Sequence, residues 1–445
     1  QGNAGSGAGG AVYADNSLVL SDTNILSSTT TGSAGGAWVN ASAVVIGGVF
    51  QNNTCLTAGC WGGGLMAQYT LTLTGSQFIS NSSLGIGGGA YVRFGNATVE
   101  GAVFERNSAG TVSNIGGGGI YAEQALTAIR TTFIVNTATG GGGGAYVRLG
   151  QAVLSDTRFI SNASSFGGGG LQVGAGGLLT GVVFVTNTSS GAQGGGGFYS
   201  SGAPPVIFTG GVFEGNIATS SNAGGARFVG TATLSGTRFI SNTAGANGNG
   251  GGIFTISSIT LTNVTVISNT APGVLGGGGL YANNGTLLVT LAGGVFQGNR
   301  ATHVSTGLGG GARVQGPAIL TATQFIGNGA ISGGGLYAGS AAVPVTLTGA
   351  LFQDNQANPI TGTGGGARFQ GPVIVSNTRF INNLAGTGGG LVHSSNVARV
   401  VNSLFARNTA NLGAGLYLSS TGNAHIIHTT VASPSLASGA AIHIT

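Results

Sequence analysis

Residues 77–92 read QFISNSSLGIGGGAYV and hold the two motifs that decide the fold. The first motif is Phe-x-x-Asn, which here runs from Phe78 to Asn81. The second is a run of Gly before a short apolar stretch, here the letters GGGAYV that begin at Gly87. Both motifs recur along almost the whole chain, so one structural unit is repeated many times.

The Phe-x-x-Asn motif sets the period of the repeat. Its aromatic residues are Phe50, Phe78, Phe104, Phe133, Phe159, Phe184, Phe213, Phe239, Phe296, Phe325, Phe352, Phe380 and Phe405. Val266, with Asn269 three residues later, fills the one gap in this series. From Phe50 to Phe405 the chain takes thirteen steps in 355 residues, a mean period of 27.3 residues. A period between about 20 and 50 residues is the signature of a solenoid.

Each repeat contains three short segments of strand character. One follows the Gly run, the second alternates polar and apolar residues, as in TLTLT at 70–74, and the third contains the Phe. Coils of three strands stacked about 4.8 Å apart make a parallel β-helix, and strand crossovers are right-handed in almost all cases. We therefore predict an all-β fold: a right-handed parallel β-helix of about 16 coils, with about 27 residues and three strands per coil, in which residues 1–445 form a single domain.

The Phe and the Asn of each Phe-x-x-Asn motif have separate predicted roles. The Phe rings should stack into an internal ladder, so that Phe352 and Phe380, for example, are in contact. The Asn should lie in a corner, where its amide bonds to the backbone and to the Asn residues above and below. In the strand after the Gly run, residues one and three trade volume and should point inward, so residue two points outward.

Composition excludes several classes of protein. With 92 Gly and only 21 charged residues in 445, an ordinary helical protein is excluded, because each Gly inside a helix costs about 1 kcal/mol. Hydrophobic residues make up 41%, which argues against disorder. The longest apolar runs have four residues, so no segment is expected to span a membrane as a helix. Thirteen Arg without Lys are spread thinly, so nucleic acid is not an expected partner.

The outward second position after each Gly run forms a column rich in Tyr and Arg. We select it as a candidate exposed binding or packing column: Trp38, Tyr91, Tyr121, Tyr146, Tyr199, Arg227, Tyr281, Arg313, Tyr337, Arg368 and Tyr417. Such a ladder could stack on sugar rings or on a neighbouring molecule. The alternative is that Tyr simply favours strands and pairs with the Tyr of the next coil.

The titratable residues do not predict an active site. The eight acidic residues scatter when the coils are aligned on their Phe, and general acid–base work needs two carboxylates facing one bond. The five His lack Cys or acidic partners at ligand spacing, and His393 and His443 are expected to point inward. We therefore predict no catalytic residues, no metal site and no cofactor, with a polysaccharide lyase or hydrolase as the enzymatic alternative.

Cys55 and Cys60 are the only cysteines of the chain. They lie five positions apart in a polar stretch and are a candidate disulfide formed outside the cytoplasm, the alternative being two free thiols. The chain begins at Gln1, as a secreted protein would after removal of its signal peptide. We therefore expect an extracellular or cell-surface protein.

The paired motifs resemble the repeat of the polymorphic outer-membrane protein family, named from chlamydial surface proteins. The pair appears here as Phe78 to Asn81 with Gly88-Gly89-Ala90, and the resemblance covers essentially the whole chain. It implies a β-helical, surface-exposed segment, commonly the passenger of an autotransporter with adhesive roles. It implies no active site.

The ends of the sequence show no cap helix, and the motifs run from Gly9 to Gly439. An uncapped β-helix can satisfy its edges by stacking tail on head. We therefore expect a non-enzymatic structural protein whose subunits stack into a filament, or alternatively a cell-surface adhesin that binds glycans or components of a host or neighbouring cell.

Overall fold

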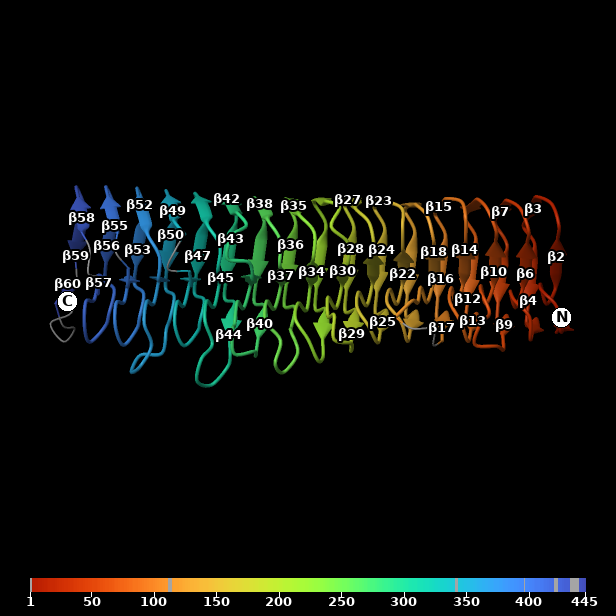
Figure 1. The fold of residues 1–445 in the computed structure, drawn as a ribbon, viewed down its shortest axis with the longest axis horizontal. Coiled ribbons are helices and arrows are strands. Elements are labelled where there is room, and N and C mark those ends of the chain that lie inside the picture. Colours follow the sequence, from red (N-terminus) through yellow and green to blue (C-terminus); the bar gives the residue numbers. More distant parts are fainter. Residues whose placement is uncertain (1, 111–113, 341–342, 396, 420–422, 433–439) are drawn as a thin grey trace. The chain divides into compact units, whose positions relative to one another are not determined.

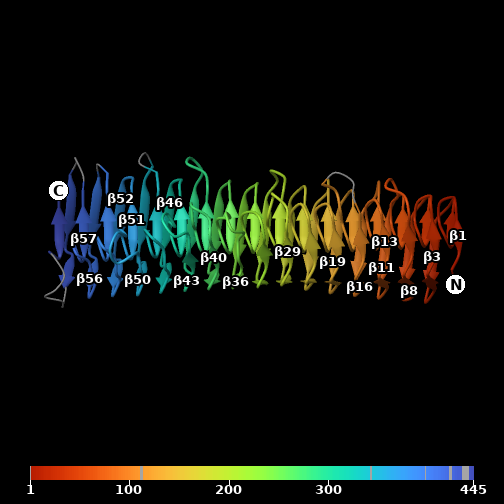
Figure 2. The same ribbon diagram turned by 90° about the horizontal axis from the view of Figure 1, so that it is seen from below.

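The computed structural model describes residues 2–110, 114–340, 343–395, 397–419, 423–432 and 440–445. Within these ranges the chain is all β, without a helix, and every strand pairing is parallel. It divides into two compact units, one formed by residues 1–221 and 225–230 and the other by residues 222–224 and 231–445. Each unit is a parallel β-solenoid, in which strands of successive turns lie side by side (Figures 1 and 2). The predicted β-helix is confirmed.

Each turn contributes one strand to each of three long sheets. In one turn of the first unit these are β10 (Leu65–Ala67) after the Gly run, β11 (Leu71–Thr74) with alternating residues, and β12 (Gln77–Ile79) with the Phe. The corresponding turn of the second unit has β48 (Leu336–Ala338), β49 (Val345–Thr348) and β50 (Leu351–Gln353). We call the three the Gly-run sheet, the alternating sheet and the Phe sheet.

The Gly-run sheet carries the candidate column. Its strands in the first unit are β2 (Val12–Ala14), β6 (Ala37–Val39), β10, β14 (Ala90–Val92), β18 (Ile120–Ala122), β22 (Ala145–Val147), β26 (Leu171–Val173), β30 (Phe198–Ser200) and β34 (Ala226–Phe228). Those in the second unit are β37 (Ile253–Thr255), β41 (Leu280–Ala282), β45 (Ala312–Val314), β48, β51 (Ala367–Phe369), β54 (Leu391–His393), β57 (Leu416–Leu418) and β60 (Ile442–Ile444).

A fourth, two-residue strand follows the Asn in many turns, which the sequence did not predict. It forms a nine-stranded sheet in the first unit, with β9 (Thr54–Cys55), β13 (Ser82–Ser83) and β17 (Ser108–Ala109) among its members. In the second unit β40 (Thr270–Ala271) pairs with β44 (Arg300–Ala301). Two residues are too few to show an alternating pattern, so no sequence signal marks these strands.

The Phe residues stack as predicted. Consecutive rings from Phe50 to Phe213 have centroids 4.6–4.9 Å apart. Those from Phe296 to Phe405 are 4.6–5.0 Å apart. For Phe352 and Phe380 the separation is 4.8 Å. This spacing equals the distance between neighbouring strands, so the sheet itself sets the contact between the rings.

Within the Asn ladder an amide such as that of Asn81 makes four hydrogen bonds. Asn81 Nδ2 donates to the carbonyl oxygen of Phe50 at 2.8 Å and to Asn107 Oδ1 at 3.0 Å. Asn81 Oδ1 accepts from Asn53 N at 3.1 Å and from Asn53 Nδ2 at 2.9 Å. These side chains are fully buried, and a buried amide is stable only when it is satisfied in this way. The predicted corner role is confirmed.

The Gly run has a steric origin. A Cβ on Gly89 would lie 2.5 Å from the carbonyl oxygen of Gly119 and 3.0 Å from Phe104 Cδ1. Only Gly allows the backbone to pass so close to the ring stack and the next turn. The strand that follows points its first and third residues inward as predicted, and Ala90 and Val92 are fully buried.

Candidate binding site

The candidate column points away from the interior of the solenoid, but most of it is buried. Seven of its members, Tyr91, Tyr121, Tyr146, Tyr199, Tyr281, Arg313 and Tyr337, are at most 8% exposed. The other four, Trp38, Arg227, Arg368 and Tyr417, are half-buried. The prediction of a solvent-exposed column is therefore wrong for most of its length.

Loops between the Asn and the Gly run cover the column. In the first unit the hydroxyl of Tyr199 lies 3.1 Å from Gln193 Oε1, and the guanidinium of Arg227 donates to the carbonyl oxygen of Gln193. In the second unit Arg313 Nη1 donates to the carbonyl oxygen of Leu275 at 2.7 Å. Alternation along a strand fixes which face a side chain takes, and these loops decide whether that face meets water.

The register of the column produces stacked contacts between neighbouring turns. Tyr91 and Tyr121 stack with centroids 5.2 Å apart, as the alternative interpretation of Tyr–Tyr pairing predicts. In the second unit the Arg313 guanidinium lies 5.0 Å from the Tyr281 ring centre and 5.5 Å from that of Tyr337. Burial lowers the pKa of Arg313, opposed by the neighbouring tyrosines. These cation–π contacts hold adjacent turns together.

One part of the first unit carries a cleft beside the buried Tyr91 and Tyr121 of the column. The cleft has a volume of about 450 Å³ and lies at β14 and β18 of the Gly-run sheet. Its lining residues are Trp61, Ile86, Tyr91, Arg93, Phe94, Ile115, Tyr121, Glu123, Gln124, Arg148 and Leu149. We call it the aromatic cleft. Phe94 and Leu149 are more than half exposed, which makes one rim of the cleft both apolar and accessible.

Charged and phenolic groups meet at one side of the aromatic cleft. Tyr121 Oη donates to Glu123 Oε2 at 2.9 Å, and Arg148 Nη1 donates to Glu123 Oε1 at 2.6 Å. Burial raises the pKa of Tyr91 to about 12, helped by Glu123 and opposed by Arg93 and Arg148. The pKa of Tyr121 is raised further, first by burial and then by Glu123. Both phenols therefore stay protonated at neutral pH.

Arg93 stands one turn before Glu123, at the matching position after its strand. Its guanidinium carbon is 4.7 Å from the Trp61 ring centre and 4.6 Å from that of Phe94. The ion pairs among the described residues join Arg106 to Glu105, Arg130 to Glu100 and Arg148 to Glu123. Arg93 is in none of these pairs, and its side chain makes no hydrogen bond within the described part of the chain.

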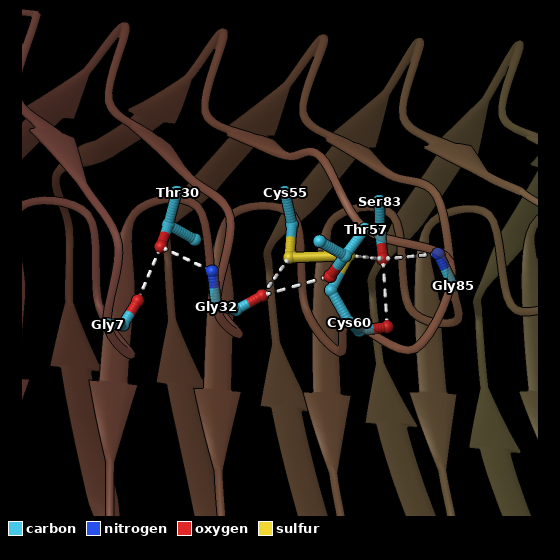
Figure 3. Close-up of a disulfide and its surroundings, with 8 residues drawn as sticks. All are labelled: Gly7, Thr30, Gly32, Cys55, Thr57, Cys60, Ser83 and Gly85. Atoms are coloured by element: carbon cyan, nitrogen blue, oxygen red, sulfur yellow. Dashed lines mark hydrogen bonds between the residues drawn. A yellow bond between two sulfur atoms is a disulfide. The ribbon is translucent and has the colours of Figure 1, made fainter.

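The disulfide lies next to the aromatic cleft. Cys55 and Cys60 are joined as predicted, with their Cα atoms 6.1 Å apart (Figure 3). Trp61 follows Cys60 directly in the sequence. Cys60 O accepts from Ile86 N at 3.2 Å, and Gly62 N donates to Ile86 O at 3.0 Å. The bonded loop and the strand-like pairing of Trp61 with Ile86 together fix the ring that forms one wall.

Sequence reasoning missed Trp61, Arg93 and Phe94 as a group. Trp61 and Phe94 lie outside the repeated columns, and Arg93 occupies the fourth position after the Gly run, where the residue type varies from turn to turn. Two signals were present in the sequence: Trp61 is one of two Trp and follows a cysteine, and Phe94 is a Phe outside the ladder.

The remaining titratable residues are placed as follows. Among the described residues no group of three or more His, Cys, Asp or Glu gathers where a metal could bind. His393 is fully buried in the interior, as predicted, with Nε2 3.2 Å from the carbonyl oxygen of Gly371. His443 instead pairs in register with Tyr417 at the outward position, so the prediction that His443 points inward is wrong.

In the described part of the chain no helix is long and apolar enough to cross a membrane.

Comparison of the sequence and structure with protein-family models, with curated proteins and with solved structures finds no match.

Proposed function

We propose that this protein is a non-enzymatic, extracellular β-solenoid that binds a ligand in the aromatic cleft, as an adhesin-type binding module. The observation that carries the proposal is the cleft itself, which combines aromatic walls with a few convergent polar groups. Sites of this volume, mostly apolar with a small number of orienting polar groups, are typical of small-molecule and saccharide recognition.

The character of the lining supports binding rather than chemistry. Glu123 is the only carboxylate among the lining residues, and it already accepts from Tyr121 and Arg148. A hydrolytic or eliminative reaction needs a second group free to move a proton at the same bond. The extracellular assignment is supported by the disulfide, because such bonds persist mainly in oxidising compartments.

Binding to a panel of immobilised saccharides tests the proposal. Trp61→Ala removes one wall of the cleft and should abolish binding of whichever saccharide the unmodified protein retains. Phe166→Ala is the matched control, because Phe166 is also a half-buried loop aromatic of the first unit but lies outside the cleft. The proposal is contradicted if the unmodified protein retains no saccharide, or if both variants lose binding to the same extent. Release of new reducing or unsaturated ends from a bound saccharide contradicts its non-enzymatic part.

Head-to-tail stacking into a filament stays a prediction of the sequence. Electron microscopy of purified protein tests it: long unbranched fibres support stacking, and isolated particles at high concentration contradict it.

A further inference from the structure

The Arg93 guanidinium is the unusual group of the aromatic cleft. Its half-buried side chain lies over two aromatic rings, within 4.7 Å of the Trp61 centre and 4.6 Å of the Phe94 centre. In these contacts the cation is attracted to the faces of the two rings. The N–H groups of a guanidinium lie in the plane of the group, so they are directed away from a ring that stacks on it. Arg93 is therefore held in place without an acidic partner among the described residues.

The charges of the lining residues do not sum to zero. Glu123 is engaged by Arg148 Nη1 at 2.6 Å and by the hydroxyl of Tyr121 at 2.9 Å. The three charged lining residues, Arg93, Glu123 and Arg148, therefore leave one positive charge in excess. A ligand that fills the cleft gains most if it brings one anionic group with oxygen atoms in a plane, because a guanidinium binds a carboxylate through two parallel hydrogen bonds.

Backbone pairing restricts the kind of ligand that fits. Phe94 N donates to Gln68 O at 2.8 Å, and Leu149 N donates to Glu123 O at 2.9 Å. The strands beneath are bonded in register to the turns on either side, so the floor of the cleft offers no free strand edge to an extended peptide. Recognition must use side chains, namely the exposed Phe94 and Leu149 for C–H surfaces and Arg93 for an anion.

We propose that the aromatic cleft binds an acidic saccharide, with a sugar ring packed on the exposed rim formed by Phe94 and Leu149 and the carboxylate of a uronic-acid residue held by Arg93. This rests on the proposed function and adds to it the class of ligand. The chemistry shared by the possible ligands is an anionic group beside a pyranose ring. A carboxylate fits the two-pronged geometry of a guanidinium better than a tetrahedral sulfate, whose oxygens do not lie in one plane.

Isothermal titration calorimetry of the full chain tests this with three probes. They are an oligosaccharide of alternating glucuronate and N-acetylglucosamine, the same oligosaccharide with its carboxylates reduced to alcohols, and a sulfated neutral oligosaccharide. The acidic probe should bind at least about tenfold more tightly than the reduced one, and more weakly as salt is added. The sulfated probe should fall between them.

Two substitutions locate the effect. Arg93→Gln should weaken binding of the acidic probe at least about tenfold and leave the reduced probe unchanged. Arg93→Lys should recover only part of the loss, because Lys keeps the charge but not the planar pair of donors. Arg158→Gln is the matched control, since Arg158 is an exposed arginine of β24 (Arg158–Ile160) in the same unit and lies outside the cleft.

The outcomes separate this inference from the proposed function. Equal affinity for the acidic and reduced probes, both lost in Trp61→Ala, would leave the binding function standing and overturn the carboxylate assignment. Tighter binding of the sulfated probe, or an Arg93→Gln variant that binds like the unmodified protein, would also overturn it. Failure of every saccharide probe, with binding of a free peptide carboxylate instead, would overturn the saccharide part of both.

Discussion

Replacing one ladder amide should destabilise the second unit far more than replacing its exposed neighbour. Asn383 Nδ2 donates to the carbonyl oxygen of Phe352 and to Asn408 Oδ1, both at 2.9 Å. Its Oδ1 accepts from the backbone N and from Nδ2 of Asn355, both at 3.0 Å. Asn383→Ala removes all four bonds and leaves two buried N–H groups of Asn355 without an acceptor.

The magnitude follows from the groups left without a partner. A buried donor that loses its hydrogen bond costs about 1–3 kcal/mol, so two of them should lower the free energy of unfolding by about 2–6 kcal/mol. The preceding residue supplies the control. Asn382 is exposed and has a φ of +55°, which Gly adopts without strain, so Asn382→Gly should change the free energy of unfolding by less than about 1 kcal/mol.

Two measurements check this prediction. Urea denaturation gives the loss of stability, and hydrogen exchange gives its location, because long repeat arrays need not unfold in one step. Protection of the Asn355 amide should fall in Asn383→Ala and persist in Asn382→Gly. If the two variants unfold at the same urea concentration, the amide ladder is not a principal source of stability, and the reasoning fails.

Three further predictions follow from the same packing. Gly366→Ala places a Cβ 2.5 Å from the carbonyl oxygen of Gly390 and should lower the free energy of unfolding by at least about 2 kcal/mol. In the control Gly285→Ala the nearest atom is 4.0 Å from the added Cβ, so the free energy of unfolding should fall by less than about 1 kcal/mol. Equal melting temperatures of the two variants would refute this. Burial lowers the pKa of His393, so the unfolded chain takes up a proton below pH about 6.5 that the folded chain refuses, and stability should fall from there as the pH drops. His393→Phe should flatten that slope between pH 7 and pH 5 in urea denaturation, and an unchanged slope would contradict the assignment. Burial raises the pKa of Tyr91 to about 12, so an ultraviolet titration should show late phenolate absorbance that is reduced in Tyr91→Phe, and stability should decrease as the pH rises above about 10. Unchanged late absorbance in Tyr91→Phe would show that Tyr91 does not contribute to it.

The repeated part of the fold could be predicted because each repeated residue has one physical task. Phe at a fixed spacing gives rings that stack at the strand separation, and Asn three residues on gives an amide that bonds along the axis. Gly stands where a Cβ would strike the next turn, as at Gly89. These tasks depend only on identity and spacing, both of which the sequence displays directly.

The burial of the Tyr and Arg column could not be predicted in this way. Alternation correctly placed Tyr121 and Tyr281 outside the interior, yet both are fully buried. The groups that cover the column, such as Leu275, belong to loops that differ in length and composition from turn to turn. A periodic pattern says nothing about residues that do not repeat, so the exposure of the column could come only from the structure.

The contrast between residues that repeat in every turn and residues that do not indicates where a function can lie in such a protein. A residue that recurs in every turn is already used by the turn above and the turn below, as Arg313 is between Tyr281 and Tyr337. Its side chain has little left to offer a ligand. A residue at a position that varies from turn to turn can keep part of its bonding capacity free: Arg93 stacks on Trp61 of the preceding turn but forms no ion pair among the described residues. Recognition by a solenoid built of saturated ladders must therefore come from the residues that break its repeat.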